Sequence, residues 1–251
     1  TRVGLNFWPM LNHVSIEDVL FLDIETVPQY SSYSELSIEY KTLWDKKATS
    51  LVKDAQLDTP ELVYQRAGIY AEFGKIVCIS AGMVVTKDGE RFFRVKSFAG
   101  ADEKTLLEGF SVMLNRFSAR NTSFLCAHNG KEFDFPFIAR RMLINGLPIP
   151  QVLDVAGKKP WEVPFLDTME LWKFGDFKHY TSLNLLAYVF NIPTPKDDID
   201  GSQVAHVFYV ENDVERIAIY CEKDTLTVAQ LLLRYKGEAL INPENIERVQ
   251  G

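Results

Sequence analysis

The sequence lacks any run of about eighteen consecutive apolar residues, although hydrophobic residues make up 47% of its 251 positions. Because a helix that crosses a bilayer needs roughly 20 mainly apolar residues, we expect no membrane-spanning segment. The first residues also lack a basic region followed by an apolar stretch, so nothing indicates a secretory signal. These absences favour a cytoplasmic protein without a membrane partner.

Cysteine is scarce as well. The three cysteines, Cys78, Cys126 and Cys221, are odd in number, lie in apolar surroundings and form no C-x-x-C pair. This pattern disfavours both a disulfide framework and a zinc ribbon. We expect all three to be reduced residues of the core.

Positive charge is in short supply. The chain has 27 lysines and arginines against 34 aspartates and glutamates, a formal net charge of −7. Because nonspecific affinity for nucleic acid comes mainly from cations placed on phosphates, this balance is unfavourable for broad electrostatic binding of a polyanion. Any binding of nucleic acid must therefore be local.

The length and the hydrophobic fraction are within the range of one large domain. The sequence contains no internal repeat, low-complexity tract or interdomain linker, so we predict a single domain over residues 1–251. The segment 28–74 is too long for an unstructured connection in a compact domain. Its content of Tyr, Leu, Lys and Glu predicts a helical insertion.

Apolar patterning predicts a sheet flanked by helices. Short apolar or alternating runs predict strands at 19–25, 76–85, 92–98, 123–127 and 165–169. Helical spacing predicts helices at 102–118, 133–144, 181–190, 201–209 and 212–237. The last helix opens with Asn212 and Glu215 in capping-box spacing. The first three strands are expected to form an antiparallel meander, and the fourth to lie parallel beside the first.

Four acidic residues lie at the ends or starts of these elements. Asp23 and Glu25 end the first strand, and Asp134 begins the second helix. Asp224 follows Tyr220 by four positions on the last helix. Residues two apart on a strand share a face, and residues four apart on a helix are neighbours. Converging carboxylates repel one another, and divalent cations that prefer carboxylate oxygens relieve this repulsion, so the sequence predicts a two-metal site for Mg²⁺ or Mn²⁺.

These contexts resemble the motifs of a known family, the DEDD exonucleases of the ribonuclease-H-like superfamily, in the DEDDy variant that has tyrosine in the third motif. The matching stretches, in order, are Asp23-Ile24-Glu25-Thr26, Asn129 to Asp134, and Tyr220-x-x-x-Asp224. The order of strands and helices between them also fits, over residues 19–235. The resemblance is closest to the proofreading exonuclease domain of B-family DNA polymerases. It implies a ribonuclease-H-like α/β fold, with a mixed β-sheet of an antiparallel meander plus parallel strands, flanked by α-helices.

The resemblance also implies an activity. The chain would be a metal-dependent 3′-to-5′ exonuclease that releases nucleoside 5′-monophosphates from the 3′ end of single-stranded or frayed DNA. Asp23, Glu25 and Asp224 would bind the ion that activates the attacking water, and Asp23 with Asp134 would hold the second ion. Tyr220 would orient that water, because a phenol is a poor base at neutral pH.

Other residues of the motifs would bind the substrate. By the same resemblance, Thr26 and Asn129 would contact the terminal nucleotide, and Phe133 would shape its pocket. His128 lacks a partner at metal-ligand spacing and Asp167 lies in a predicted strand, so we expect structural roles for both.

The segment 173–180 interleaves basic and aromatic residues. Such a composition binds single-stranded nucleic acid in some proteins and packs a loop against the core in others, and the sequence favours neither. The pairs Arg140-Arg141 and Lys158-Lys159 are interpreted as solvated surface.

Alternatives remain open at the level of function. The same acids serve RNA, and no feature can be assigned to recognition of a 2′-hydroxyl, so an exoribonuclease is the nearest alternative. A non-catalytic nucleic-acid-binding or scaffold module of the same fold is a second. An endonuclease of the same superfamily, which would cut circular single strands, is a third.

Overall fold

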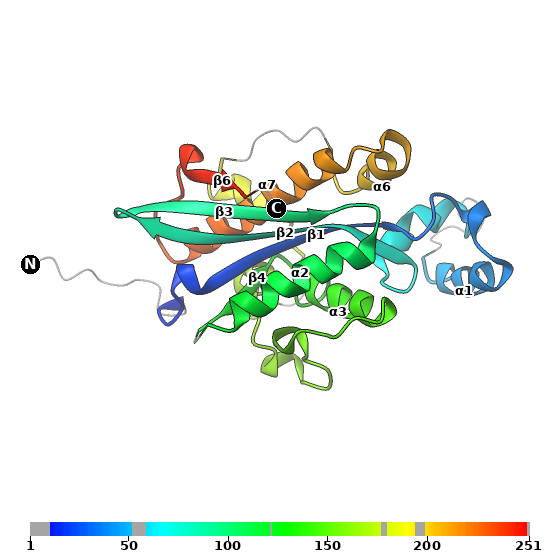
Figure 1. Cartoon of the computed structure of the whole chain (residues 1–251), viewed down its shortest axis with the longest axis horizontal. Coiled ribbons are helices and arrows are strands. Elements are labelled where there is room, and N and C mark those ends of the chain that lie inside the picture. Colours follow the sequence, from blue (N-terminus) through cyan, green and yellow to red (C-terminus); the bar gives the residue numbers. More distant parts are fainter. Residues whose placement is uncertain (1–10, 52–58, 121, 177–179, 194–198, 250–251) are drawn as a thin grey trace, which may run out of the picture.

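The computed structural model describes residues 11–51, 59–120, 122–176, 180–193 and 199–249. Its centre is a six-stranded mixed sheet, in which the strands are ordered β5-β4-β1-β2-β3-β6 (Figure 1). The strands are β1 (Val19–Pro28), β2 (Gly74–Lys87), β3 (Glu90–Ala99), β4 (Phe124–Ala127), β5 (Leu166–Asp167) and β6 (Ile246–Arg248).

The pairing of the strands matches the expected topology. β1, β2 and β3 form an antiparallel meander, and β4 pairs in parallel with β1. β5 is parallel to β4, and β6 is parallel to β3 at the far edge. The predicted ribonuclease-H-like mixed sheet flanked by helices is therefore confirmed, and so is the pairing that brings the second acidic motif beside the first.

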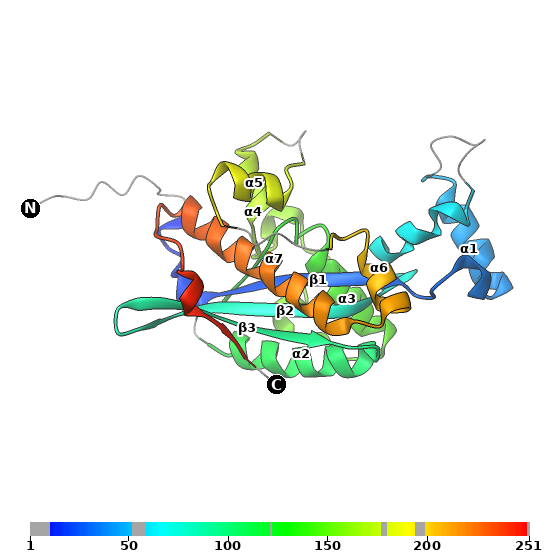
Figure 2. The same ribbon diagram turned by 90° about the horizontal axis from the view of Figure 1, so that it is seen from above.

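Helices cover both faces of the sheet. α2 (Glu103–Ser118) and α3 (Asp134–Ile144) lie on one face, and α7 (Val214–Tyr235) crosses the other (Figures 1 and 2). The shorter helices are α1 (Ile38–Ala48), α4 (Thr168–Lys173), α5 (Leu183–Val189) and α6 (Val204–His206), together with a π-helical turn at Val207–Glu211 and several 3-10 turns.

β1 separates the two layers because its side chains alternate. Leu20, Leu22 and Ile24 belong to the buried cluster formed with α2 and α3. Phe21 belongs to the cluster under α7. Asp23 and Glu25 follow Phe21 at intervals of two on the same side of the strand, so both carboxylates are directed toward α7.

A lobe made of α1 and the 3-10 helix Leu62–Ile69 projects from one end of the sheet (Figures 1 and 2). Its centre is Trp44, which is fully buried and lies 5.5 Å from Tyr64 and 5.2 Å from Phe73 between ring centroids. Aromatic side chains bury large areas, which gives this small lobe a core of its own.

Arg141 of α3 ties the base of the lobe to the helical layer, so its interpretation as solvated surface was wrong: it is 4% exposed. Its guanidinium donates to Glu103 at 2.6 and 2.9 Å, to the Ala71 carbonyl at 2.8 Å and to Gln29 at 3.2 Å. Asn145 donates to the same Glu103 carboxylate at 2.9 Å. Arg141 and Glu103 are both buried, and charge-assisted bonds of this kind are the strong ones. We call Arg141, Glu103 and Asn145 the anchor cluster.

One predicted strand is too long. The apolar run 165–169 predicted a strand throughout, but β5 ends at Asp167 and α4 begins at Thr168. The reason is that the Asp167 carboxylate accepts hydrogen bonds from the backbone N–H groups of the first turn of α4 and caps that helix.

The starts of the last two helices also differ from the prediction. The predicted capping box was wrong, because Asn212 adopts the left-handed conformation with φ of 56° and Asp213 caps α7 instead. The helix predicted at 201–209 starts only at Val204 and continues as a π-helical turn. Within the described residues, none of the helices is both long and apolar enough to cross a membrane.

Candidate active site

The first motif lies where β1 emerges from between the two apolar layers. Glu25 is 8% exposed, and Asp23 is partly buried with a fully buried Oδ2. The register between β1 and β2 shifts between Glu25 and Thr26, which places an irregularity of the sheet beside the carboxylates. Such bulges re-aim side chains and are common near functional sites.

The second motif is a tight loop between β4 and α3. Asn129 has a left-handed backbone with φ of 62°. At Gly130 an added Cβ would lie 2.4 Å from the Ala127 Cβ, so only glycine fits. The loop delivers Asp134 to the first turn of α3, where it is 4% exposed. The backbone N–H of Ile24 donates to its carboxylate, which joins the second motif to β1.

Asp167 holds this loop in place, a role that the sequence analysis missed. Its carboxylate accepts from the backbone N–H groups of Asn129 and Lys131, each at 3.0 Å, while it also caps α4. Asp167 is 3% exposed. The available signal was an Asp-Thr pair at the end of an apolar run, which is a typical helix N-cap.

The third motif lies on α7, which covers the face of the sheet opposite to α3. Tyr220 and Asp224 are one turn apart, and a hydrogen bond joins their side chains. Cys221 between them donates to the backbone carbonyl of Asp23 at 3.3 Å. This contact joins α7 to β1 at the position of Asp23. The structure thus brings Asp23, Glu25, Asp134, Tyr220 and Asp224 to one place.

Burial and repulsion dominate the electrostatics. Burial raises the pKa of Asp23 well above its ordinary value, and the charges of Glu25, Asp224 and Asp134 raise it further. Burial is likewise the main cause of the raised pKa of Glu25. The pKa of Asp134 rises to about 7, mainly through burial, although two backbone hydrogen bonds oppose the shift. The site therefore favours anything that supplies positive charge.

Burial and the nearby carboxylates also affect the pKa of Tyr220. Burial raises the pKa of Tyr220, and the charges of Asp224, Glu25 and Asp23 together with the hydrogen bond to Asp224 raise it further. Tyr220 therefore stays protonated at neutral pH. Its hydroxyl can donate or align, but it cannot act as a base.

The residues present fit divalent cations. Among the described residues, Asp23 Oδ2 is buried without a hydrogen-bond partner. Oxygen atoms of Asp23 and Glu25 and the Sγ of Cys221 lie within 4.8 Å of one another. Because burial raises the pKa of the Cys221 thiol, the carboxylates are the better donors, and carboxylate oxygens suit Mg²⁺ and Mn²⁺.

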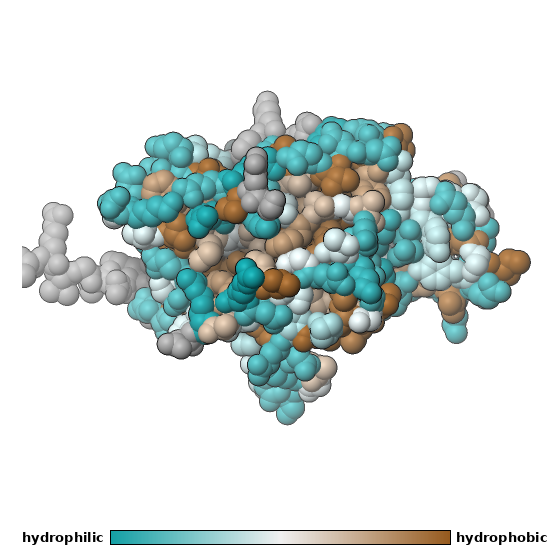
Figure 3. Space-filling view, in the orientation of Figure 1, coloured by the Kyte–Doolittle hydropathy of each residue, from teal (hydrophilic) through white to brown (hydrophobic). Residues whose placement is uncertain are grey.

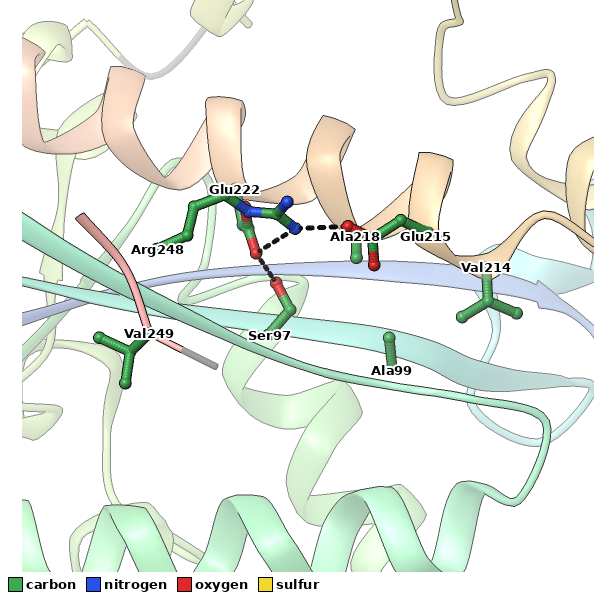
Figure 4. A pocket seen from close by; sticks show the side chains of 8 residues that line it. All are labelled: Ser97, Ala99, Val214, Glu215, Ala218, Glu222, Arg248 and Val249. Carbon is green, nitrogen blue, oxygen red and sulfur yellow. Dashed lines mark hydrogen bonds and ion pairs between the residues drawn. The ribbon is translucent and has the colours of Figure 1, made fainter. Parts of the chain in front are cut away.

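A polar network centred on the buried Glu222 supports α7 on the side away from the acids. Ser97 of β3 donates to Glu222 at 2.8 Å, and Arg248 of β6 binds Glu222 at 2.5 Å and Glu215 at 2.8 Å (Figure 4). These side chains line a cavity of about 570 Å³ between α7 and the edge of the sheet. Arg248 thereby binds α7 at Glu215 and Glu222, on either side of Tyr220 in the sequence.

The three predicted substrate-binding residues differ from one another in burial and in contacts. Thr26 is half-buried next to Glu25. The side-chain Oδ1 of Asn129 is buried without a partner in the described part of the chain. Phe133 packs against Phe137, with 5.4 Å between ring centroids, at the margin of the core. Their contacts with a nucleotide stay predictions.

His128 has the geometry of a structural residue. Its two ring nitrogens lie 2.9 Å from the Thr168 hydroxyl and 2.9 Å from the Thr181 carbonyl. Burial lowers its pKa. Both nitrogens are thus engaged within the protein.

The fold and the site together define a class, α/β domains in which a mixed sheet and its flanking helices gather carboxylates at one place. Comparison with known families identifies the family. The model of a family described as "Predicted 3'-5' exonuclease related to the exonuclease domain of PolB" matches residues 69–245, more than half of the chain. The chain belongs to this family. The matched region includes Asp134, Tyr220 and Asp224 and begins after Asp23 and Glu25.

Solved structures contain similar chains. The family B DNA polymerase from the hyperthermophilic archaeon Pyrobaculum calidifontis is 15% identical, with a TM-score of 0.48. The similarity covers 86% of this chain and 24% of the polymerase chain, so this chain spans about a quarter of the polymerase's length. No similar protein was found among curated proteins.

Proposed function

We propose that the protein is a metal-dependent 3′-to-5′ exonuclease that acts on single-stranded or frayed DNA and releases nucleoside 5′-monophosphates. The observation that carries this proposal is the convergence of Asp23, Glu25 and Asp134, whose pKa values are raised mainly by burial, with repulsion from neighbouring site carboxylates adding to the shift at Asp23 and Glu25. Perturbed carboxyl groups gathered in this way are typical of functional sites. Membership of the exonuclease family supports the same conclusion.

The four carboxylates would hold two divalent ions. Asp23, Glu25 and Asp224 would hold one, and Asp23 with Asp134 the other. When bound, such ions lower the pKa of an attacking water and stabilise the leaving 3′ oxygen. The chain's own contribution is to fix the donors on three rigid elements, β1, α3 and α7, and to keep their surroundings apolar.

Tyr220 would align the attacking water. Its hydroxyl stays protonated because burial and nearby negative charge raise its pKa. The hydrogen bond to Asp224 holds the ring in one orientation, and correct orientation of a nucleophile contributes to the rate. Thr26 and Asn129 would contact the terminal nucleotide, and Phe133 would shape its pocket.

The test follows 5′-labelled single-stranded DNA and its RNA counterpart with Mg²⁺, Mn²⁺ or EDTA. Wild-type protein, Asp224→Ala and Glu108→Ala are compared, since Glu108 is an exposed acid on α2 at the opposite face. The expected result is a metal-dependent ladder that shortens from the 3′ end, lost in Asp224→Ala and kept in Glu108→Ala. An active Asp224→Ala protein would contradict the site.

The same experiment decides between the alternatives. Faster shortening of RNA than of DNA would make the protein an exoribonuclease. Tight binding of a 3′ end without products under either metal would identify a binding module. Cleavage of circular single strands would identify an endonuclease, because an exonuclease needs an end.

A further inference from the structure

A second hollow lies beside the acidic site, on the other side of the second motif. It is a cavity of about 490 Å³, lined by Asn129 and Lys131 from the motif loop, Lys158 from the segment before β5, and Lys173 from the end of α4. A neighbouring cavity of about 340 Å³ shares Lys131 and Lys173 and adds Phe174. We call the two together the lysine groove.

The lysine groove lies next to the acidic site because one loop contributes residues to both. The loop that contributes Asn129 and Lys131 to the groove delivers Asp134 to the acidic site three residues later. Asp167 fastens both parts of that loop. The groove also lies beyond the carboxyl ends of the parallel strands β4 and β5, where open α/β sheets bind their ligands.

The larger cavity is lined by three lysines and by three acids, Glu132, Asp167 and Glu170, and some of these charges are already engaged. Lys131 is paired with Glu170 at 2.5 Å, and the Asp167 carboxylate is occupied by backbone N–H groups. Within the described part of the chain, Lys158 and Lys173 form no ion pair. Glu132 and Glu170 are the exposed acids at the rim, and Glu170 is the one paired with Lys131. Two amines thus remain to meet an anion, in a chain with a net charge of −7.

Exposed aromatic rings flank these lysines. Phe174 is 73% exposed and has a left-handed backbone with φ of 42°, which is unfavourable for a bulky residue. Trp161 is 77% exposed, and Lys159 lies over its ring at 5.3 Å. The segment that carries Trp161 forms a mainly hydrophilic lobe at the lower edge of the molecule (Figure 3). Packing explains neither exposed ring, and residues 177–179 of the basic and aromatic segment lie outside the described residues.

We propose that the lysine groove binds the single-stranded nucleic acid upstream of the 3′ end, with phosphates at Lys158 and Lys173 and a base stacked on Phe174. This inference rests on the proposed function and names the path that the substrate strand takes to Asp134. Lysines that follow a backbone and aromatic rings that stack on bases are the combination that single-strand binders use. Because these lysines are placed locally, they can bind phosphates although the overall charge of the chain is unfavourable for binding a polyanion.

The first test measures binding of fluorescein-labelled single strands of DNA and RNA in EDTA, by anisotropy over a range of salt concentrations. Lys158→Ala/Lys173→Ala is compared with Lys104→Ala/Arg116→Ala, two exposed cations on α2 at the opposite face. Because each phosphate contact on a single strand contributes about 0.7 to the salt slope, the groove variant should lose about 1.4 of slope and roughly tenfold in affinity. The control should match wild-type protein.

The second test uses Phe174→Gly. Glycine accepts the left-handed backbone without strain, so the variant should keep or raise its melting temperature while its affinity for strands falls several-fold. A purely structural role for Phe174 would lower the melting temperature and leave affinity per folded molecule unchanged.

The outcomes separate this inference from the proposed function. Loss of affinity and salt slope in the groove variant, with an unchanged control, supports the groove. Wild-type affinity and slope in the groove variant would overturn the groove alone. Failure of wild-type protein to bind any single strand would overturn the groove and the proposed function together.

Discussion

Two buried polar clusters lie on opposite faces of the same sheet, and they are built on opposite principles. The anchor cluster pairs Arg141 with Glu103 and satisfies both groups with backbone and side-chain partners. The acidic site gathers like charges and leaves Asp23 Oδ2 without a partner among the described residues. The first needs nothing from outside the chain. The second is complete only when a cation or a proton joins it.

The difference identifies which cluster stabilises the protein and which one acts. A buried pair that is fully hydrogen-bonded fixes a geometry, whereas removal of one partner is costly. Buried like charges raise one another's pKa values and persist only where the surrounding structure over-determines them. Here the apolar clusters on either side of the acids supply that structure.

The largest expected effect comes from removing a charge from the acidic site. Asp23→Asn should lower exonuclease activity by about a thousandfold, equivalent to roughly 4 kcal/mol of transition-state stabilisation. The metal-free variant should melt at the same or a higher temperature, because a source of repulsion is gone. Product ladders and thermal melts in EDTA measure both. A large drop in melting temperature would show that Asp23 stabilises the fold.

The opposite result is expected from the anchor cluster. Arg141→Met should lower the free energy of unfolding by about 3–5 kcal/mol, because Glu103 is left as a buried unpaired charge. Activity per folded molecule should persist at temperatures where the variant is folded. Chemical denaturation checks the first point. The double variant Arg141→Met/Glu103→Leu should regain part of the loss, and equal instability of the two variants would contradict a pairwise role.

The pH dependence of stability should also distinguish the acidic site from the anchor cluster. In metal-free protein, folded Asp134 keeps its proton up to pH about 7, whereas the unfolded chain releases it near pH 4. The resulting stability is therefore fully present below about pH 4 and lost as the pH rises through about 7, a contribution on the order of 4 kcal/mol. Melting temperatures in EDTA should fall between these limits.

Two controls sharpen this prediction. Asp134→Asn should remove the part of the fall that Asp134 contributes, because the amide does not titrate, while Asp23 and Glu25 keep the rest. Mn²⁺ at high pH should restore the wild-type melting temperature. A melting temperature that is independent of pH in EDTA would argue against a raised pKa at Asp134.

The smallest expected effect tests the support of α7. Arg248→Ala removes two ion pairs to α7 and should raise the half-saturating Mn²⁺ concentration about threefold to tenfold, or ~1 kcal/mol. Arg94→Ala is the matched control, because Arg94 of β3 binds Glu247 of β6, the strand that carries Arg248, at 3.2 Å. Direct measurement of Mn²⁺ binding by both variants checks this prediction. Equal shifts of the half-saturating concentration in the two variants would show that Arg248 stabilises only the edge strand.

The sheet and the acidic site were predictable because their signals are local. The alternation of β1, the turn before β3 and the spacing of Asp23 with Glu25 are each contained in a few residues. The order of the three motifs then placed Asp134 and Asp224 on the correct elements. The elements that carry these residues followed from backbone periodicity together with the order of the motifs.

The supporting contacts were not predictable for a physical reason. Ser97 meets Glu222 across 125 positions of sequence, and Asp167 meets Asn129 across 38, with no periodic pattern to announce either pair. The left-handed backbone at Phe174 also violates the preference of its residue type. Such features depend on how finished elements meet, which a single sequence does not encode locally.

The strand order has a consequence for the time at which the site comes into existence. Asp23 and Asp224 are 201 positions apart (224 − 23), and the two neighbours of β1 in the sheet come from later parts of the chain. At a synthesis rate of about 5–20 residues per second, at least about 10 s pass between the two acids. A growing chain therefore carries an incomplete set of carboxylates until α7 emerges, and nuclease activity would begin only when the domain is nearly finished.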